Sequence, residues 1–581
     1  MNSLGSNSSS SPAPEPTSLR SSRAWLRPLV YLAITASVIV LPMPFLGNAS
    51  GHDFQFHLAS WMEVANQWHE HILFPRWAEW GNFGFGEPRF IFYPPLSWLA
   101  GAALGSVLPW VIVPGTYLWL LLVAGGMAMW RFAREWLSNA EASAAAVFFA
   151  VNPYSLVIVY YRSDFAELLA WSLFPLLILG VLRVWRDGWS GVPLLSVVFA
   201  AIWLSNAPAG VIASYSVALL LALGTIYKRR LRPAVIGAAA MIIGLGLAAF
   251  YIVPAAYEQR WVQISEVVSL NLAPERNFIF AHSPDPEFQL FNWKVSAAAM
   301  LLLLIAGIAA VFVARRRRNF LEIWWMLLAL GAAATFLMFP PSTLLWRHLP
   351  KLRFLQFPWR WLGPLGVVFA AFVASCWTNP KRRRITWAAV LALLALLASG
   401  IASDAWWDSE DVDHVADGIQ SGYGYEGTDE YAPVGADIYA LPGWIAPDTE
   451  PSGDPTPSVE ELPDDETKPV PLKYSHVKIE KWTAVRKSFT VDADSPVTLA
   501  IRLVDYPAWH VSIDGAASPA ATLKETGQML VPIAAGTHRV EIRFVRTPDR
   551  TAGGIISLIA AFGLIAIAKT QRGRHDRASA P

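Results

Sequence analysis

The sequence has little cysteine and little charge. Its single cysteine, Cys376, lies in an apolar run of a 581-residue chain, so disulfides, thiolate zinc sites and a cysteine nucleophile are excluded within one chain. Charged residues make up 15% of the chain and hydrophobic residues 54%, and the mean hydropathy is +0.37. This composition excludes an ordinary soluble protein and indicates a multispan membrane protein. The net charge of +1 does not indicate a nucleic acid partner, and none is expected.

Twelve apolar runs are long enough to cross the roughly 30 Å hydrocarbon core of a bilayer. They lie near residues 28–47, 111–130, 141–159, 165–183, 190–207, 209–226, 235–253, 296–314, 321–338, 361–378, 385–402 and 555–569. Arginine and lysine clusters flank the runs, and the positive-inside rule then predicts twelve crossings with both termini in the cytoplasm. The weaker apolar stretch 94–108 is expected to be re-entrant or interfacial, and it would add a thirteenth crossing if it spans. The predicted fold is an α-helical polytopic membrane protein with about 12–13 transmembrane helices.

Composition divides the chain into segments. Residues 1–27, rich in serine and proline, are predicted to form a disordered cytoplasmic N-terminus, followed by a polytopic membrane domain at 28–402 with an outer loop at 48–93. Residues 403–476 are acidic and loop-rich, with no lysine or arginine between 403 and 467. In residues 477–550 the apolar alternation and the turn Asp514-Gly515 predict an antiparallel β-sandwich-like domain. A final transmembrane helix at 555–569 and a cytoplasmic tail at 570–581 follow, so residues 403–554 are expected to be extracytoplasmic.

This map leaves four segments of the membrane domain on the outer side, at residues 48–93, 160–167, 254–295 and 339–360. Many charges at one membrane surface are typical of a site that is assembled from several helix ends. We therefore expect these four segments to share one cavity.

The first outer loop concentrates candidate chemistry. It contains His52, Asp53 and His57, and apolar residues recur at helical spacing from Phe54 to Ile72. This spacing predicts an amphipathic helix that lies on the membrane surface. Asp53 stands at the start of the helix, where a carboxylate can cap free backbone amides. Because two histidines lie beside it, Asp53 is also a candidate general base, and the two interpretations are compatible.

Charged residues in the other outer segments are candidates for binding an anion. Arg162, Asp164 and Glu167 lie at the outer start of a membrane run, where a structural ion pair is as expected as a functional one. The segment 339–360 is basic on the outer side, against the positive-inside trend. A lipid phosphate or diphosphate would explain this exception, and ordinary contact with lipid headgroups is the alternative.

Several motifs together resemble a known family. They are an acidic first outer loop (Asp53), PRW, N-x-G-x-G-x-P and FYPPL within residues 75–96, Y-x-R-x-x-x-A-E ending at Glu167, and FPWRWL at 357–362. This set resembles bacterial membrane proteins labelled "6-pyruvoyl-tetrahydropterin synthase-related". The pterin enzyme itself is soluble and uses a histidine zinc site, which nothing here matches. The membrane family is similar to the GT-C glycosyltransferases, multispan proteins that use lipid-phosphate-linked sugar donors.

The resemblance implies the transfer of a sugar from a polyprenyl-phosphate donor to an acceptor hydroxyl of a glycan, lipid or protein, at the outer face of a bacterial inner membrane. Asp53 matches the acidic residue that serves as general base in the family, and direct displacement would invert the anomeric centre. Arg353 and Arg360, with Arg162 behind them, would neutralise the leaving phosphate. No metal site is assigned, although Asp164 and Glu167 are candidates for holding a divalent metal ion or orienting the acceptor. The candidate substrate-binding residues are His52, His57, Arg76, Glu87, Arg162, Asp164, Glu167, Arg353 and Arg360.

Two other functions fit the same residues. A non-catalytic protein could bind or transport a lipid-linked glycan in the same outer cavity. Alternatively, the acidic segment and the β-domain could bind a cell-envelope partner in an assembly scaffold. Substitution of Asp53 separates the first alternative from an enzyme, because a binding protein needs no general base.

Overall fold

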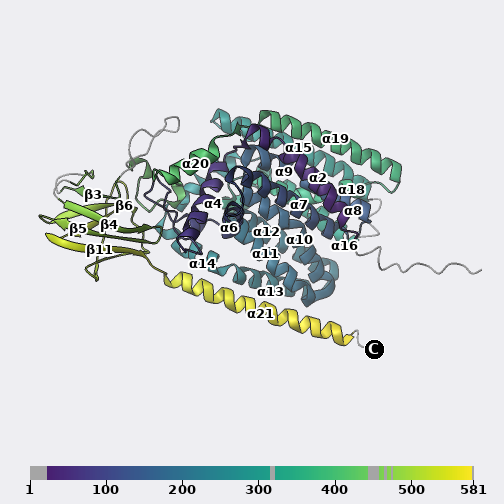
Figure 1. Ribbon diagram of the computed structural model, residues 1–581. Coiled ribbons are helices and arrows are strands. Elements are labelled where there is room, and N and C mark those ends of the chain that lie inside the picture. The colour runs from purple at the N-terminus through teal and green to yellow at the C-terminus, as the bar shows by residue number, and fades with distance from the viewer. Residues whose placement is uncertain (1–22, 315–320, 442–456, 464–467, 473–474, 579–581) are drawn as a thin grey trace, which may run out of the picture.

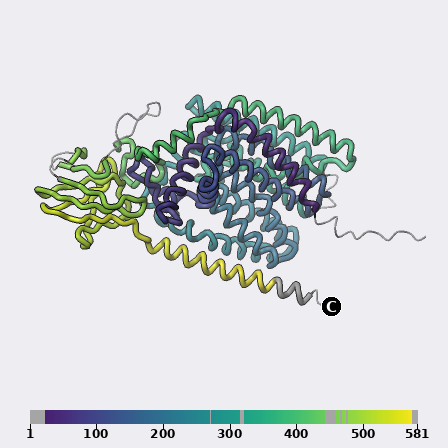
Figure 2. Tube along the Cα trace, viewed as in Figure 1, coloured from purple at the N-terminus to yellow at the C-terminus, as the bar shows by residue number. Residues whose placement is uncertain are grey.

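The computed structural model describes residues 23–314, 321–441, 457–463, 468–472 and 475–578. A helical body carries a β-sandwich at one end, and the last helix runs back along the body (Figure 1). The helix α2 begins at the end of the body opposite the sandwich, and the last helix runs toward that same end (Figure 2). Residues 1–22, most of the segment predicted to be disordered, lie outside the described residues. The predicted polytopic helical fold with an antiparallel β-domain is confirmed.

The α-helices are α2 (Leu26–Val40), α3 (Met43–Leu46), α4 (Phe54–His69), α5 (Arg89–Phe92), α6 (Pro95–Gly105), α7 (Val113–Ala133), α8 (Asn139–Ala150), α9 (Pro153–Val157), α10 (Phe165–Asp187), α11 (Val192–Ser205), α12 (Ala207–Lys228), α13 (Arg232–Leu247), α14 (Ala249–Glu258), α15 (Pro286–Ala314), α16 (Leu321–Leu337), α17 (Thr343–His348), α18 (Leu362–Ser375), α19 (Pro380–Asp404), α20 (Asp411–Gln420) and α21 (Pro548–Ala578). Short helical turns that bear on the site are η2 (Ile158–Arg162), η3 (Gly188–Gly191), η5 (Ile264–Val268), η10 (Leu352–Leu355), η11 (Pro358–Trp361) and η12 (Asp429–Tyr431).

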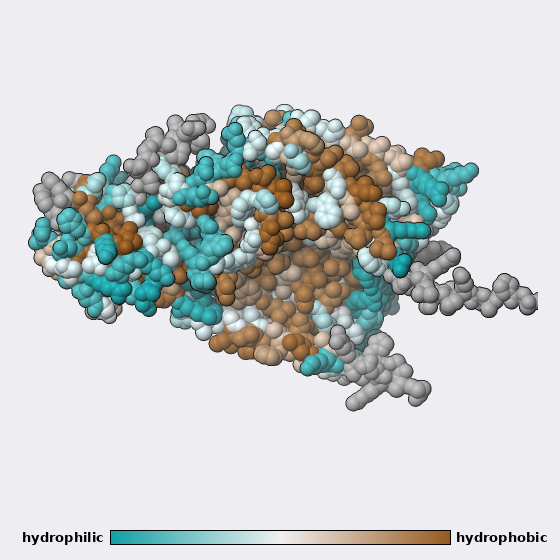
Figure 3. All heavy atoms as spheres, in the orientation of Figure 1, coloured by the Kyte–Doolittle hydropathy of each residue, from teal (hydrophilic) through white to brown (hydrophobic). Residues whose placement is uncertain are grey.

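All twelve predicted apolar runs fall in helices, but fewer segments than expected qualify as membrane spans. Among the described residues, eight helical segments are long and apolar enough to cross a membrane, or up to ten if each of two bent pairs is one span. One segment, Phe165–Ser205, joins α10 and α11 through η3, although the two helices pack against each other. Another expected span, α18, has only 14 residues. Apolar residues cover the helical body between two polar ends, as expected for a membrane belt (Figure 3).

The first outer loop forms the predicted helix, α4, but not on the membrane surface. α4 packs against α6 and α20, and both its apolar Trp61 and its polar Glu63 and Gln67 are buried. The Glu63 carboxylate accepts hydrogen bonds from the Tyr425 hydroxyl and the backbone amide of Glu79. The prediction of a surface helix is therefore wrong, because protein groups replace water on the polar face. The neighbouring α6 has 11 residues, too few to cross roughly 30 Å of hydrocarbon.

The β-domain is a sandwich of two antiparallel sheets. One has the strand order β3 (Val459–Leu462), β6 (Val497–Val504), β10 (Gln528–Ile533) and β9 (Ala521–Thr522). The other has the order β4 (Ser475–Thr483), β5 (Arg486–Ala493), β11 (Gly536–Phe544), β7 (Trp509–Ile513) and β8 (Ala516–Ser518). The predicted turn at Asp514-Gly515 joins β7 to β8, with both residues at positive φ. The strand β3 lies in the segment 403–476, which was predicted to be an acidic, loop-rich segment. It forms a strand there because its Val459 packs into the core of the sandwich.

The sandwich is fixed to the helical body by buried contacts with the first outer loop. Trp77 and Phe85, which a surface loop would present to lipid, are buried in the core of the sandwich instead. Lys487 of β5 pairs with Glu79 at 2.9 Å, and both side chains are buried. Gly84 has a φ of +83°, a conformation that favours glycine, and an added Cβ there would also displace the guanidinium of Arg502, which would lie 2.3 Å away. The first outer loop therefore anchors the β-domain to the helical body.

Candidate functional site

A cavity of about 700 Å³ lies where helix ends of the body meet the acidic segment. All four predicted outer segments line it, through Asp53, Arg162, Asn277 and Arg360 among others. The prediction of a shared cavity is confirmed. Further parts of the wall come from α14, from the end of α11 and the start of α12, and from residues 427–431 of the acidic segment.

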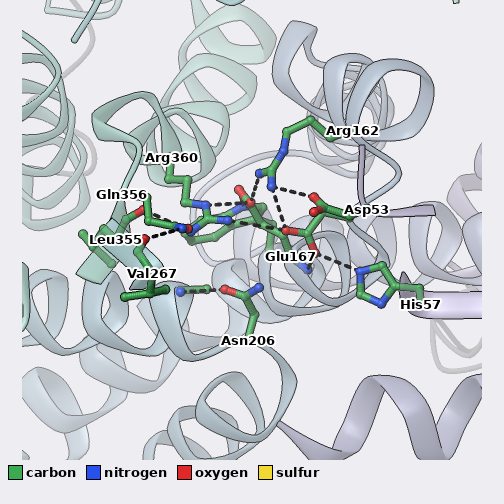
Figure 4. A network of polar contacts seen from close by, with 12 residues as sticks. Asp53, His57, Arg162, Glu167, Asn206, Val267, Leu355, Gln356 and Arg360 are labelled. Atoms are coloured by element: carbon green, nitrogen blue, oxygen red, sulfur yellow. Dashed lines mark hydrogen bonds and ion pairs between the residues drawn. The ribbon is translucent and has the colours of Figure 1, made fainter. Parts of the chain in front are cut away.

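Two arginines and three carboxylates form an ion cluster at this cavity, and Figure 4 labels four of them, Asp53, Arg162, Glu167 and Arg360. The Arg162 guanidinium lies 2.7 Å from Asp53 Oδ2, 2.6 Å from Glu167 Oε2 and 3.3 Å from Asp164 Oδ2. Arg360 Nε lies 3.1 Å from the same Glu167 oxygen, and its Nη2 lies 3.7 Å from Asp164. Four of the five side chains are at most 6% exposed, whereas Asp53 is 35% exposed. Asp53 is therefore the member of the cluster that a substrate can reach.

Local backbone geometry brings the cluster together. Gly51 passes so close to the Tyr161 carbonyl that a Cβ would lie 2.5 Å from its oxygen, and the Asp53 amide donates to the Arg162 carbonyl at 2.9 Å. The turn η2 ends at Ser163, whose φ is +54°. Asp164 then caps α10 by accepting from the Glu167 amide at 2.8 Å. Because the chain reverses at Ser163, the side chains of Arg162 and Asp164, which flank it, both face the first outer loop.

Asp53 occupies the N-cap position of α4, but its side chain accepts no capping hydrogen bond. Its carboxylate is turned toward Arg162 instead. Asp53 is therefore the N-cap residue of α4, as predicted, but the prediction that its side chain caps the backbone amides is wrong. An ion pair with a guanidinium is a stronger interaction than a neutral amide cap offers.

The two histidines lie on different sides of Asp53. His57 is buried, with its Nε2 3.4 Å from Asp164 Oδ1. His52 lines the cavity and packs edge-on against Phe291, with 4.8 Å between ring centroids. Both predicted histidines thus belong to the site, His57 behind the cluster and His52 at the cavity surface.

Three predicted residues are not brought into the cavity. Arg76 lies beside α14, where its Nη2 donates to the Phe250 carbonyl at 3.3 Å. Arg353 is exposed and lies 3.5 Å from Glu275. Glu87 is buried beside Arg89, and it accepts from the Thr428 amide at 2.8 Å. Glu87 therefore holds the cavity wall in place without facing the cavity.

Other cavity residues were not predicted individually. Lys351 lines the cavity although Arg353, two residues later, does not, because η10 turns the two side chains apart. Asn206 caps α12 through the Ala209 amide at 2.9 Å, and Gln356 donates to the Val267 carbonyl at 2.7 Å. Glu430 lines the cavity from η12, and burial raises the pKa of its carboxyl to about 7. Its sequence context, an acidic run, predicts only a solvated surface, so no sequence signal marks it.

The ion cluster does not fit a divalent metal ion. Asp164 and Glu167 direct their carboxylates at Arg162 and Arg360, and the guanidiniums occupy the oxygens that a metal would need. No group of three or more histidine, cysteine, aspartate or glutamate side chains suited to a metal occurs in the described part of the chain. The suggestion of a metal at Asp164 and Glu167 is thus unsupported by the donor geometry.

Residues 90–410 match the family model described as a 6-pyruvoyl-tetrahydropterin synthase related domain of a membrane protein, and the match covers more than half of the chain. The chain belongs to this family. The family indicated by the motifs is confirmed, and the matched region contains Arg162, Asp164, Glu167 and Arg360 but not Asp53. No curated protein matches the chain in sequence.

Several solved structures resemble the fold distantly. The arabinofuranosyltransferase AftD from Mycobacteria is 19% identical, with a TM-score of 0.41 over 66% of this chain and 27% of AftD. The chain thus spans about a quarter of the length of AftD. The Archaeoglobus fulgidus oligosaccharyltransferase tethered to an acceptor peptide is 16% identical, with a TM-score of 0.42 over 72% of this chain and 61% of that chain. The oligosaccharyltransferase AglB from the same organism, in complex with an inhibitory peptide and a dolichol-phosphate, is 14% identical, with a TM-score of 0.41 over 75% and 61% of the two chains.

Proposed function

We propose that this protein is an integral membrane glycosyltransferase that moves a sugar from a polyprenyl-phosphate donor to an extracytoplasmic acceptor hydroxyl. The observation that carries the proposal is the reachable carboxylate of Asp53, held by Arg162 at the charged part of a mostly apolar cavity between membrane helices. The apolar part of the lining suits a lipid chain, and the few polar and charged groups suit a sugar and a phosphate. The motif resemblance to GT-C enzymes supplies the donor class.

Asp53 acts as the general base in this mechanism. It accepts the proton of the acceptor hydroxyl while the acceptor oxygen bonds to the anomeric carbon. The bond from that carbon to the phosphate oxygen breaks, and polyprenyl phosphate leaves with the electron pair. The sugar passes through an oxocarbenium-like state, and the single displacement inverts its anomeric centre.

Lys351 is the cation best suited to the leaving phosphate. The two arginines of the cluster face three carboxylates, so their charge is already compensated. Lys351 lines the same cavity, and no carboxylate in the described part of the chain forms an ion pair with it. A free ammonium group attracts a phosphate more strongly than a guanidinium that is shared among acids.

Lys351→Gln is expected to weaken donor binding about tenfold, the effect of losing one charge-assisted hydrogen bond. The matched control is Arg353→Gln, which removes a cation of the same loop that lies outside the cavity and should leave affinity unchanged. Each purified variant in nanodiscs is titrated with undecaprenyl phosphate, the lipid part of the donor, and native mass spectrometry measures the affinity of each variant for it. The reverse pattern would assign the phosphate to Arg353.

The proposal also includes a membrane orientation. The cavity and residues 403–554 face the extracytoplasmic side of a bacterial inner membrane, and both ends of the chain face the cytoplasm. The segments are those of the sequence map: a cytoplasmic start at 1–27, the membrane domain at 28–402, the acidic segment at 403–476, the β-domain at 477–550, the last span at 555–569 and the tail at 570–581. Positive clusters at the cytoplasmic helix ends support this orientation.

The experiment that tests the function uses the purified chain in lipid nanodiscs with a panel of polyprenyl-phosphate sugars. Release of free polyprenyl phosphate, read by mass spectrometry and dependent on an added acceptor, is the expected result. Empty nanodiscs provide the background. If donors bind but none is cleaved, the protein is a lipid-linked-glycan binding or transport protein and the proposal fails.

A further inference from the structure

Glu430 is a carboxyl in the cavity that the mechanism above does not use. It lines the cavity from η12. Apart from its own backbone amide, it has no hydrogen bond or ion pair to any other residue that the structure describes. The other cavity carboxylates differ, because Asp53 and Asp164 each face a guanidinium. A partly buried acid without a protein partner has its hydrogen-bonding capacity left for a ligand.

The backbone that carries Glu430 is held on both sides. Before it, the Thr428 amide donates to Glu87 at 2.8 Å. After it, Tyr431 stacks on Phe92 with 5.6 Å between ring centroids, and the Gln263 amide donates to the Ala432 carbonyl at 2.9 Å. These contacts come from the first outer loop and from the loop before η5. The carboxyl is therefore positioned by rigid elements, as binding groups in preorganised sites are.

The protonation of Glu430 also suits a hydroxyl ligand. Burial is the largest of the causes that raise its pKa to about 7, and the nearby Glu87 and Asp429 act in the same direction. A carboxyl near half-protonation can donate one hydrogen bond and accept another. Neighbouring hydroxyls of a sugar ring offer the complementary donor and acceptor.

We propose that Glu430 binds the hydroxyl groups of a carbohydrate acceptor, and so determines acceptor specificity. This inference rests on the proposed function. The acceptor is favoured over the donor because η12 belongs to the acidic segment outside the membrane helices, whereas a lipid donor enters from the bilayer. An acid at this position also repels phosphate, which places the donor phosphate toward Lys351.

Labelling with dicyclohexylcarbodiimide tests the site without any turnover. The protonated carboxyl adds across one C=N bond of the reagent, and the O-acylisourea formed rearranges to a stable N-acylurea. With the full-length protein in nanodiscs, peptide mass spectrometry is expected to find this adduct on Glu430, half-maximal near pH 7 and lost as the pH rises. Glu430→Gln removes the adduct, and the matched control Glu426→Gln, an exposed acid of the same segment, does not.

Protection identifies the ligand class. A panel of methyl hexosides and methyl pentosides is added before the reagent, and at least one is expected to reduce labelling of Glu430 several-fold. Absence of the adduct, or labelling that every glycoside leaves unchanged, overturns the inference. Protection without any sugar transfer in the donor panel supports Glu430 as a carbohydrate-binding residue while refuting the glycosyltransferase.

Steady-state kinetics can test the role of Glu430 separately from the glycosyltransferase function. Once a donor and an acceptor have been found, Glu430→Gln should raise the KM for the acceptor about tenfold with a smaller change in kcat, because a binding contact is lost and the base is kept. Glu426→Gln should change neither constant. Transfer with an unchanged acceptor KM in Glu430→Gln would refute the inference and leave the proposed function standing.

Discussion

Asp53→Asn is expected to reduce sugar transfer about a thousandfold or more while donor binding stays within a factor of two, because positioned general bases contribute 10²- to 10⁴-fold to rate. Asparagine keeps a side-chain oxygen for Arg162, which now lies 2.7 Å from Asp53 Oδ2, so the cavity should keep its shape. It cannot accept the acceptor's proton. Release of polyprenyl phosphate and native mass spectrometry of the donor complex measure the two quantities in the same nanodiscs.

The matched control is Glu275→Gln, which removes another outer-loop carboxylate that pairs with an arginine but does not line the cavity. It should transfer sugar at the wild-type rate. Wild-type turnover by Asp53→Asn would mean that another group takes the proton. Weak donor binding in that variant would instead mean that Asp53 helps to shape the cavity.

Arg162→Gln is expected to be the most destabilising single change in the site, by about 3–5 kcal/mol, because it leaves buried carboxylates without their main counter-charge. Glu167 is completely buried and would keep Arg360 as its one cationic partner, besides the hydroxyl of Tyr154 and the indole N–H of Trp171 among the described residues. Thermal unfolding in detergent, followed by the fraction that remains monodisperse, measures the loss. The cost arises from uncompensated charge, so a second substitution, Glu167→Gln, should recover part of it.

Arg347→Gln provides the comparison. Arg347 is 58% exposed and lies 3.6 Å from Glu275, so its removal should cost about 1 kcal/mol or less. If Arg162→Gln unfolds at the wild-type temperature, the cluster is not a structural ion network. If the double variant is less stable than Arg162→Gln alone, compensation between the two charges is refuted.

The helical body was predictable because its signal is local. An apolar run long enough to cross a bilayer must satisfy its own backbone hydrogen bonds, so it forms a helix whatever its neighbours are. The β-domain was predictable for a similar reason, since alternation along the strands and a turn such as Asp514-Gly515 depend on a few adjacent residues. Neither pattern reports where an element packs. This is why α4 was correctly expected as a helix and wrongly expected at the membrane surface.

The candidate site was predictable in part. Asp53, Arg162, Asp164, Glu167 and Arg360 were named from charge in outer segments, and they meet in one cluster. Arg353 and Lys351 share a loop and a charge, and only the turn between them decides which one reaches the cavity. Glu430 was hidden in an acidic run, because its place depends on contacts that its neighbours Thr428 and Tyr431 make with Glu87 and Phe92, far away in the sequence.

The amino-acid sequence by itself determined that this is a multispan membrane protein with a disulfide-free β-domain, and which segments between the apolar runs carry charge, because hydropathy and periodicity are properties of neighbouring residues. Only the tertiary structure decided which of those charges are paired and which remain available. Pairing depends on distances of a few ångströms between residues that can be hundreds of positions apart, as between Asp53 and Arg162 or between Glu79 and Lys487. In a low-dielectric interior such distances decide whether a carboxylate is a structural partner or a group that can act on a substrate.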